Sequence, residues 1–295
     1  CIRACGELVG NYTLGVEERG AKSFLVADLG TPLGQSSCIS CGVCVQVCPT
    51  GALIDRVSAY RGKELQVDHH QTICVGCSVG CGIDVLTRDN HLVRIEGLWD
   101  SPVSSGLTCE IGRFKPLDEQ GERITTPYIR KNGALRAATW DEALDTVAAH
   151  LKPAAGKAKD GVSALISTRQ PVETLTLFKH IFNGYLKSED VTTIEEEKPS
   201  TAALVAGELG WPFEGTLSDI EKADCVVVAG ANLVNNHQVA GFLVKRNLLG
   251  GTKLIVVDPR QNTLDPLANI SLKGKKGSDL DTITALTTAV HQLKS

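Results

Sequence analysis

The 295-residue sequence predicts an α/β protein in which two cysteine-rich parts precede an open parallel sheet covered by helices. Ten of the eleven cysteines lie within the first 109 residues in short-spaced groups, and only Cys225 lies beyond them. From about residue 125, strand-length apolar runs alternate with helical segments, as in sheets that are buried on both faces. We therefore predict three domains, at residues 1–66, 67–124 and 125–295.

The composition excludes several classes of function. The chain is 42% hydrophobic and carries a net charge of −4, so it lacks the basic surface that nucleic acids or an anionic membrane require. No apolar run approaches the ~18 residues that span a bilayer, and no signal peptide opens the chain. We expect a soluble cytoplasmic protein with no nucleic-acid partner and no membrane insertion. Because the sequence starts at Cys1 and contains no methionine, we also expect it to begin inside a longer polypeptide.

The first domain contains a ferredoxin-type cysteine motif. Residues 38–49 read C-x2-C-x2-C-x3-C-P, in which three cysteines bind one [4Fe–4S] cube and the fourth binds another. Residues 1–5, CIRAC, match the last two cysteines of the same motif. The predicted ligands are Cys5, Cys38, Cys41 and Cys44 on one cube, and Cys1 and Cys48, with two cysteines upstream of this sequence, on the other.

Three alternatives concern these cysteines. Zinc sites usually pair C-x2-C knuckles across a longer spacer, which does not match residues 38–49. Cys1 and Cys5 could be buried cysteines that bind no cluster. A disulfide framework is typical of small secreted domains, whereas grouped cysteines without a signal peptide favour metal binding in a reducing compartment.

The second domain contains a different motif, C-x2-C-x3-C-x27-C. Alternating apolar residues on either side of Asp89-Asn90 predict a β-hairpin over residues 82–97, which would return the fourth cysteine to the other three. We interpret His69 and His70 as surface residues, because four thiolates already complete the site. The predicted ligands of this third [4Fe–4S] cube are Cys74, Cys77, Cys81 and Cys109.

The third domain begins with a predicted helix over residues 139–151, with Thr139 as its N-cap and Glu142 three residues later. Predicted strands follow at residues 162–168, 224–230 and 253–259. The helical segment that separates the last two ends at Gly250-Gly251, so these two strands should be parallel and joined by a right-handed crossover. A final helix is predicted at about residues 279–293. Cys225 is interpreted as a buried strand residue, because free cysteine behaves as a small hydrophobe.

The second cysteine motif, the following GRF, and RITTPYIRKNGALRAATWDEALDTVA at residues 123–148 resemble the N-terminal part of the molybdopterin oxidoreductase superfamily. With a two-cluster ferredoxin domain upstream, the order resembles the catalytic subunit of cytoplasmic NAD-dependent formate dehydrogenases and the large iron–sulfur subunit of complex I, the NADH-quinone oxidoreductase. The resemblance covers essentially the whole chain. It implies a molybdopterin-oxidoreductase-like α/β domain that binds a molybdopterin guanine dinucleotide with molybdenum or tungsten. Asp258 would lie at the end of a strand, where its carboxylate could accept a hydrogen bond from guanine. The implied contacts are Asn232, His237, Asp258, Arg260, Gly277 and Asp279.

The sequence departs from the catalytic members of that superfamily. They carry a Cys or selenocysteine metal ligand where this chain has Glu197 or Lys198, and a lysine where it has Ile111. They also need some hundreds of further residues to enclose the cofactor. We interpret Glu195–Glu197 as a solvated acidic turn rather than a carboxylate metal site. We therefore expect no working molybdenum site and a degenerate α/β domain kept as a scaffold.

These observations predict an iron–sulfur electron-transfer subunit of a multisubunit oxidoreductase. Three [4Fe–4S] clusters would relay electrons between an NAD(H)-linked flavoprotein subunit and other redox subunits, and no catalytic residue is assigned. One alternative is a fragment of a formate dehydrogenase-type enzyme with a molybdenum or tungsten bis-pterin centre that oxidises formate or reduces CO2. The other is a structural protein whose clusters only stabilise the fold.

Overall fold

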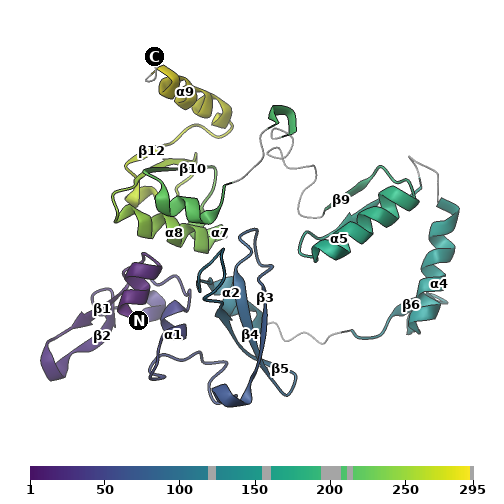
Figure 1. Cartoon of the computed structure of the whole chain (residues 1–295), viewed down its shortest axis with the longest axis horizontal. Coiled ribbons are helices and arrows are strands. Elements are labelled where there is room, and N and C mark those ends of the chain that lie inside the picture. The colour runs from purple at the N-terminus through teal and green to yellow at the C-terminus, as the bar shows by residue number, and fades with distance from the viewer. Residues whose placement is uncertain (119–123, 155–160, 194–206, 211–214, 293–295) are drawn as a thin grey trace. The chain divides into compact units, whose positions relative to one another are not determined.

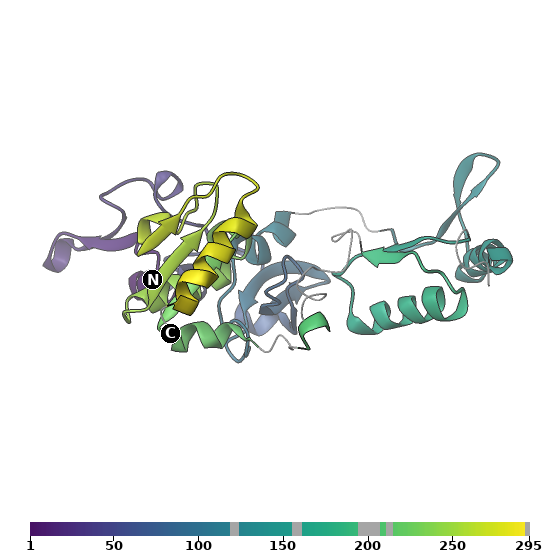
Figure 2. The same ribbon diagram turned by 90° about the horizontal axis from the view of Figure 1, so that it is seen from above.

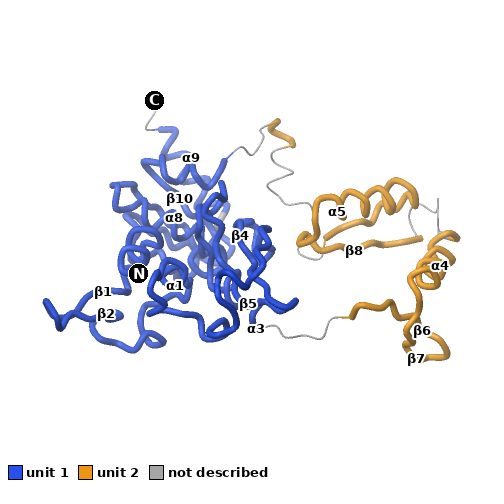
Figure 3. The backbone as a smooth tube through the Cα atoms, turned by 60° about the horizontal axis from the view of Figure 1, so that its bottom comes forward, with its two compact units in different colours: residues 1–120, 215–295 blue, residues 121–214 orange. Residues whose placement is uncertain are grey.

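A computed structural model describes residues 1–118, 124–154, 161–193, 207–210 and 215–292. The chain forms two compact units, residues 1–120 with 215–295 and residues 121–214 (Figure 3). Each unit is described by itself.

The first cysteine-rich segment of unit 1 is built from turns and short elements (Figure 1). A tight helical turn, Ala4–Leu8, is followed by an antiparallel pair of strands, β1 (Leu14–Glu17) and β2 (Phe24–Ala27). The short helix α1 (Val43–Gln46) starts after Gly42, whose φ is 70°. A Cβ atom at Gly42 would lie 2.7 Å from Arg113 Nε, so both the backbone angle and the close approach require glycine there.

The second cysteine-rich segment is a three-stranded antiparallel sheet followed by two helical turns. The elements are β3 (Asp68–Ile73), β4 (Gly82–Arg88), β5 (His91–Gly97), α2 (Glu110–Arg113) and α3 (Lys115–Asp118). Strands β4 and β5 form the predicted hairpin, and its turn residues Asp89 and Asn90 have φ of 50° and 62°. Asparagine and aspartate tolerate these left-handed angles better than most residues. The hairpin prediction is confirmed.

The C-terminal segment of unit 1 is a three-stranded parallel sheet with helices. Its elements are β10 (Cys225–Ala229), α7 (Leu233–Asn236), α8 (Gln238–Leu248), β11 (Lys253–Val257), β12 (Ile270–Leu272) and α9 (Asp279–Gln292). Strand β11 pairs in parallel with both β10 and β12, which confirms the predicted strand–helix–strand unit. Helices α7 and α8 lie together beside this sheet (Figures 1 and 2).

The prediction that Cys225 is buried is wrong. Cys225 lies in a strand, as predicted, at the first residue of β10, but its side chain is exposed. Val226 and Val228 pack into the core under the sheet, and alternate residues of a strand point to opposite faces. Cys225 and Val227 therefore share the opposite face, which is exposed in unit 1.

Unit 2 contains a hairpin, β6 (Tyr128–Lys131) with β7 (Ala134–Ala137), and the helix α4 (Trp140–Leu151). The backbone N–H of Glu142 donates to Thr139 Oγ1 at 3.2 Å, which confirms the predicted N-cap. Strand β8 (Ala164–Ile166) pairs in parallel with β9 (Val191–Thr193), and α5 (Val172–Lys179) lies between them in sequence. The parallel pairing of β8 with β9, like that of β11 with β10 and β12, agrees with the predicted parallel α/β fold, although no strand was predicted at β9.

Helix α8 contributes to two apolar clusters in unit 1. Phe242, fully buried, packs with Val9, Val43 and Leu107 from the cysteine-rich segments. Val244 packs with the strands of the parallel sheet. Burial of a side chain such as Phe242 stabilises the fold by about 2–3 kcal/mol. One helix thus holds the parallel sheet and both cysteine-rich segments together.

Candidate iron–sulfur sites

A first cavity of unit 1 is lined by four cysteines from two short segments. Two further lining residues, Asn11 and Thr13, come from the segment between the N-terminal turn and β1. The cysteines are Cys5, Cys38, Cys41 and Cys44. These are the four that the sequence assigned to one cube.

Side-chain hydrogen bonds hold the loop that carries Cys38. Asn11 Nδ2 donates to Thr13 Oγ1 at 2.6 Å and to the carbonyl oxygen of Ser37 at 2.9 Å. The Ser37 hydroxyl is 2.9 Å from Thr13 Oγ1 and donates to Asp28 Oδ1 at 2.8 Å. Thr13 is 2% exposed, so the network is anchored in the interior. It fixes residue 37 immediately before the first cysteine of the motif.

The thiols of this cavity are suited to a positively charged group. Burial raises the pKa of Cys41 to about 11 and also raises the pKa of Cys44, and neighbouring cysteine charges add to both shifts. The backbone N–H of Ser40 points at Cys38 Sγ, 3.4 Å away. Four thiolates could share this space only with a compensating metal charge, because thiolate is the form that binds metal. The residues fit an iron–sulfur cube.

A second cavity is lined by the cysteines of the second motif, Cys74, Cys77, Cys81 and Cys109. The register of β3 and β4 places Ile73 opposite Gly82, and the Cys74 N–H donates to the carbonyl oxygen of Cys81 at 2.8 Å. Cys109 is the N-cap of α2, and its Sγ accepts from the Gly112 N–H at 3.4 Å. Backbone pairing and a helix start therefore bring the four thiols together.

The second cavity also fits a bound group. Burial raises the pKa of Cys81 to about 12 and raises the pKa of Cys74, again with contributions from the other thiols of the site. Thr108, which lines the cavity, is 1% exposed. Among the described residues, its Oγ1 has no hydrogen-bond partner. A buried polar atom without a partner is costly, which is consistent with a polar group in this cavity.

Cys1 and Cys48 are the two cysteines that the sequence assigned to the other ferredoxin cube. Cys1 is exposed at the start of the chain. Cys48 lines a wider cavity with residues such as Glu64 and Arg94. The backbone N–H of Leu53, 3.4 Å from Cys48 Sγ, and smaller contributions from Thr50 lower the pKa of Cys48 to about 7.

Within the described part of the chain, no group of three or more His, Cys, Asp or Glu is arranged to hold a metal ion. A cube differs from a single ion, because each of its four irons binds its own cysteine thiolate. The four cysteine sulfurs therefore lie around the cube and do not converge on one point. His69 is exposed at the sheet surface and pairs with Asp84, 2.7 Å from Nδ1.

Three of the residues implied as pterin contacts, Asn232, Asp258 and Arg260, follow the ends of β10 and β11. Asp258 is 2% exposed, and its carboxylate accepts from the Arg260 N–H at 2.9 Å and from Asn262 Nδ2 at 3.2 Å. The Arg260 N–H is the main cause that lowers the pKa of Asp258. Asn232 accepts from Thr263 Oγ1 at 2.6 Å, so it contacts the same loop.

The other positions lie elsewhere. His237 separates α7 from α8, Gly277 has a φ of 87° before α9, and Asp279 begins α9. Ile111 lines the second cysteine cavity together with Asn235 and Asn236. The expectation for Glu195–Glu197 and Lys198 falls outside the described residues.

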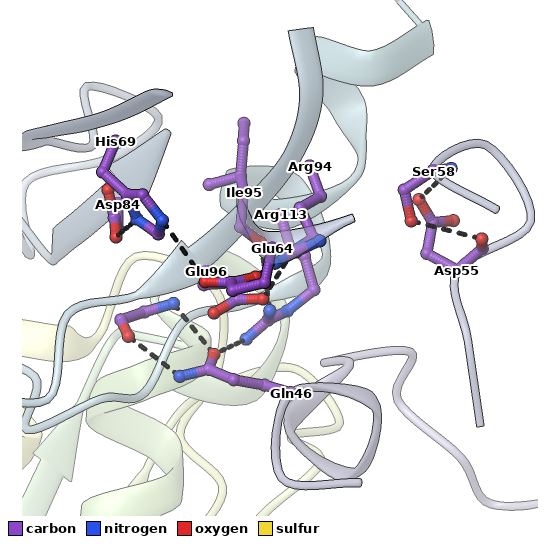
Figure 4. A network of polar contacts seen from close by, with 11 residues as sticks. Gln46, Asp55, Ser58, Glu64, His69, Asp84, Arg94, Ile95, Glu96 and Arg113 are labelled. Atoms are coloured by element: carbon purple, nitrogen blue, oxygen red, sulfur yellow. Dashed lines mark hydrogen bonds and ion pairs between the residues drawn. The ribbon is translucent and has the colours of Figure 1, made fainter. Parts of the chain in front are cut away.

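Three residues beside the cavities, Arg113, Gln238 and Lys245, were not identified from the sequence. Buried Arg113 contacts Gln46 (Figure 4). It also donates to the backbone carbonyl groups of Cys41 and Ile95. Gln238, at the start of α8, donates to the carbonyl oxygen of Ile39 at 3.2 Å and accepts from the Glu110 N–H at 3.2 Å. Lys245 Nζ donates to Asn11 Oδ1 at 2.5 Å. The sequence signal available for Arg113 was the GRF that follows the second motif.

Three family models match the chain. They are molybdopterin oxidoreductase at residues 123–293, the molybdopterin oxidoreductase Fe4S4 domain at residues 68–116, and the 4Fe-4S binding domain at residues 33–54. The first match covers more than half of the sequence, and the chain belongs to the molybdopterin oxidoreductase family. The Fe4S4 match includes all four cysteines of the second cavity, and the 4Fe-4S match includes all those of the first except Cys5. Both support [4Fe–4S] clusters in this chain.

Among curated proteins, the G 2 subunit of the NADH-quinone oxidoreductase of Rhizobium meliloti is 30% identical over 98% of this chain and 34% of its own length. The probable oxidoreductase YjgC of Bacillus subtilis is 26% identical over 97% of this chain and 33% of its own. A putative formate dehydrogenase of Staphylococcus aureus is 25% identical over 97% and 34%. The chain thus spans about a third of the length of these relatives.

Acetylene hydratase from Pelobacter acetylenicus matches 68% of this chain and 29% of its own, with a TM-score of 0.49 and 17% identity. None of the described helices is long and apolar enough to cross a membrane.

Proposed function

We propose that this chain is the iron–sulfur electron-transfer segment of an oxidoreductase. The observation that carries this proposal is that two sets of four thiols each line one cavity of the same compact unit. The first set, Cys5, Cys38, Cys41 and Cys44, would hold one [4Fe–4S] cube. The second, Cys74, Cys77, Cys81 and Cys109, would hold another. Cys1 and Cys48 would contribute to a third cube whose other ligands lie outside this sequence.

A [4Fe–4S] cube accepts and returns one electron when it is bound. The protein would fix the separation of the cubes and set their reduction potentials through hydrogen bonds, charge and burial. Backbone N–H groups of Ser40, Gly76 and Gly112 point at cysteine sulfurs, each 3.4 Å away. These contacts stabilise negative charge on sulfur, and therefore favour the reduced state. No residue of the chain is assigned a bond-making step.

The proposed context is a multisubunit complex in the cytoplasm. One relative is named as a subunit of NADH-quinone oxidoreductase, and this supports a flavoprotein linked to NAD(H) and further redox subunits as electron-transfer partners. The direction of electron flow depends on these partners.

The test is anaerobic purification followed by iron and sulfide assays. The two complete cysteine sets should bind about eight iron atoms and about eight sulfides per chain, since each cube contains four of each. Dithionite should reduce the clusters and oxidation should restore them. Stoichiometric zinc without sulfide would contradict the proposal. Clusters that cannot be reduced reversibly would leave only a structural role.

A catalytic formate dehydrogenase-type function is the second candidate. The family match at residues 123–293 and the relatives named putative formate dehydrogenases favour it. Its molybdenum or tungsten would be held by pterins, with Asn232, His237, Asp258, Arg260, Gly277 and Asp279 as the proposed nucleotide contacts. We favour electron transfer alone, because this chain has no thiol near Glu197 and has Ile111 beside the second cavity. Stoichiometric molybdenum or tungsten in the native polypeptide, with formate-dependent reduction, would reverse that preference.

A further inference from the structure

Arg113 is a buried charge that the proposed ligand sets leave unexplained. Its side chain lies at the end of α2 and is 3% exposed. Nε donates to the carbonyl oxygen of Cys41 at 3.1 Å, and Nη1 to that of Ile95 at 3.0 Å. Nη2 donates to Gln46 Oε1 at 2.6 Å (Figure 4). All three of these acceptors are neutral.

A buried guanidinium with only neutral partners is energetically costly, because it loses hydration without gaining a counter-charge. In the described part of the chain, no carboxylate lies within ion-pair distance of Arg113. The anionic groups close enough to influence it are Cys41, Glu96, Cys44 and Cys109. Glu96 already pairs with Arg94, 2.8 Å away. The remaining counter-charges are cysteines, and they belong to both cavities.

The chain is shaped to hold Arg113 between the two sites. Its backbone N–H donates to the carbonyl oxygen of Cys109 at 2.9 Å, while its side chain reaches the first motif at Cys41. Gln46 also accepts from the Gly97 N–H at 2.9 Å and donates to the Gly97 carbonyl oxygen at 2.8 Å, which fixes the amide that Arg113 contacts. Gly42 has no side chain at the point where a Cβ would collide with Arg113.

We propose that Arg113 is the shared counter-cation of the two cysteine cavities and raises the reduction potential of the cluster in each. The proposal rests on the proposed function. Four thiolates give a cube a net negative charge, and reduction adds one electron more. A fixed cation in a buried, poorly screened place therefore stabilises the reduced form of both cubes. Arginine suits this role because it stays protonated in proteins.

Lys245 provides the matched control. It extends from α8, its ammonium donates to Asn11 Oδ1, and the cysteines close enough to influence it are Cys5 and Cys41. Both belong to the first cavity. Removal of this charge should therefore change the potential of one cluster, whereas removal of Arg113 should change two.

The experiment is a redox titration, followed by electron paramagnetic resonance, of the full native polypeptide purified without oxygen. Variants C41S and C109S assign the two signals. In R113Q and R113M the reduction equilibrium of both clusters should shift tenfold or more toward the oxidised form, or 59 mV for a one-electron couple. K245Q should shift only the first cluster. R113K keeps the charge and should shift both by less than threefold.

Unchanged potentials in R113Q would overturn the proposal, and so would an R113K shift as large as that of R113Q, because a merely structural role predicts the latter. If neither R113Q nor R113M binds its clusters, the reduction potentials of the variant Q46E test the proposal instead. It places a carboxylate on the guanidinium, so both potentials should become more negative; unmoved potentials would again overturn the proposal. Failure of the wild-type clusters to reduce reversibly would instead refute the proposed function.

Discussion

The two cysteine cavities of unit 1 each contain four cysteines, but different kinds of contact position them. In the first, the loop before Cys38 is tied by side chains, through Asp28, Ser37, Thr13 and Asn11. In the second, the ladder between β3 and β4 and the start of α2 position the thiols through the backbone. Side-chain substitutions should therefore disturb the first site more easily than the second, and the two should respond separately to most changes.

The largest expected effect comes from loss of a ligand. C41S should remove the first cluster and C109S the second, so each variant should bind about four fewer iron atoms per chain, since a cube contains four. Iron and sulfide assays measure the loss. C225S is the control, because Cys225 is exposed and lines neither cavity, and it should retain full iron content. Loss of iron in C225S would refute the ligand assignment.

A glycine substitution between the two cavities should have the next largest effect. In G42A the new Cβ would lie 2.7 Å from Arg113 Nε and 2.8 Å from Phe114 Cζ, at a φ of 70°. Overpacking and left-handed strain together should lower the free energy of unfolding by about 2–4 kcal/mol. G20A, at a φ of 61° with open space around it, should cost about 1–2 kcal/mol. Denaturant unfolding compares the two, and equal losses would contradict the close contact with Arg113.

A substitution in the side-chain network should separate the two sites. S37A removes the hydroxyl that contacts Thr13 and Asp28 and should cost about 1–2 kcal/mol. A chelator should then extract the first cluster faster and the second at the wild-type rate. S23A removes only a 3.5 Å contact to the Glu18 carbonyl oxygen and serves as the control. Equal acceleration at both clusters would mean that the sites are not held independently.

The smallest expected effect is a pH dependence of the second segment. The hydrogen bond to Asp84 raises the pKa of His69 above its ordinary value of about 6.5. Protonated His69 therefore stabilises the sheet below that pH, and the contribution is lost as the pH rises through the raised pKa of the folded state. At this exposed site the gain is about 0.5 kcal/mol. Urea unfolding at pH 5.5 and pH 8.5 should show it in wild type and H91Q but not in H69Q, and a pH dependence that persists unchanged in H69Q would contradict the assignment.

The sequence predicted what is local along the chain. The spacing of the cysteines anticipated both groups of four thiols that the structure places together. Alternation around Asp89-Asn90 predicted the hairpin, and Thr139 with Glu142 predicted the helix start. These features depend on residues close in sequence, where turn and capping chemistry act directly.

What the sequence did not show depends on contacts between distant segments. Arg113 gains its role from Cys41, Gln46 and Ile95, which approach it only in the folded chain. The exposure of Cys225 depends on whether another layer covers that face of β10, which an apolar run cannot reveal. The same limit explains why the pairing of β8 with β9 was not foreseen.

In the proposed function, two separate thiol sets of this chain hold two redox-active cubes. A reductive titration of the anaerobic wild-type polypeptide, with spin counting, tests it most directly. We expect two reversible one-electron signals from these sites, one absent in C41S and the other absent in C109S. A single signal abolished by both substitutions, or no reversible signal at all, would contradict it.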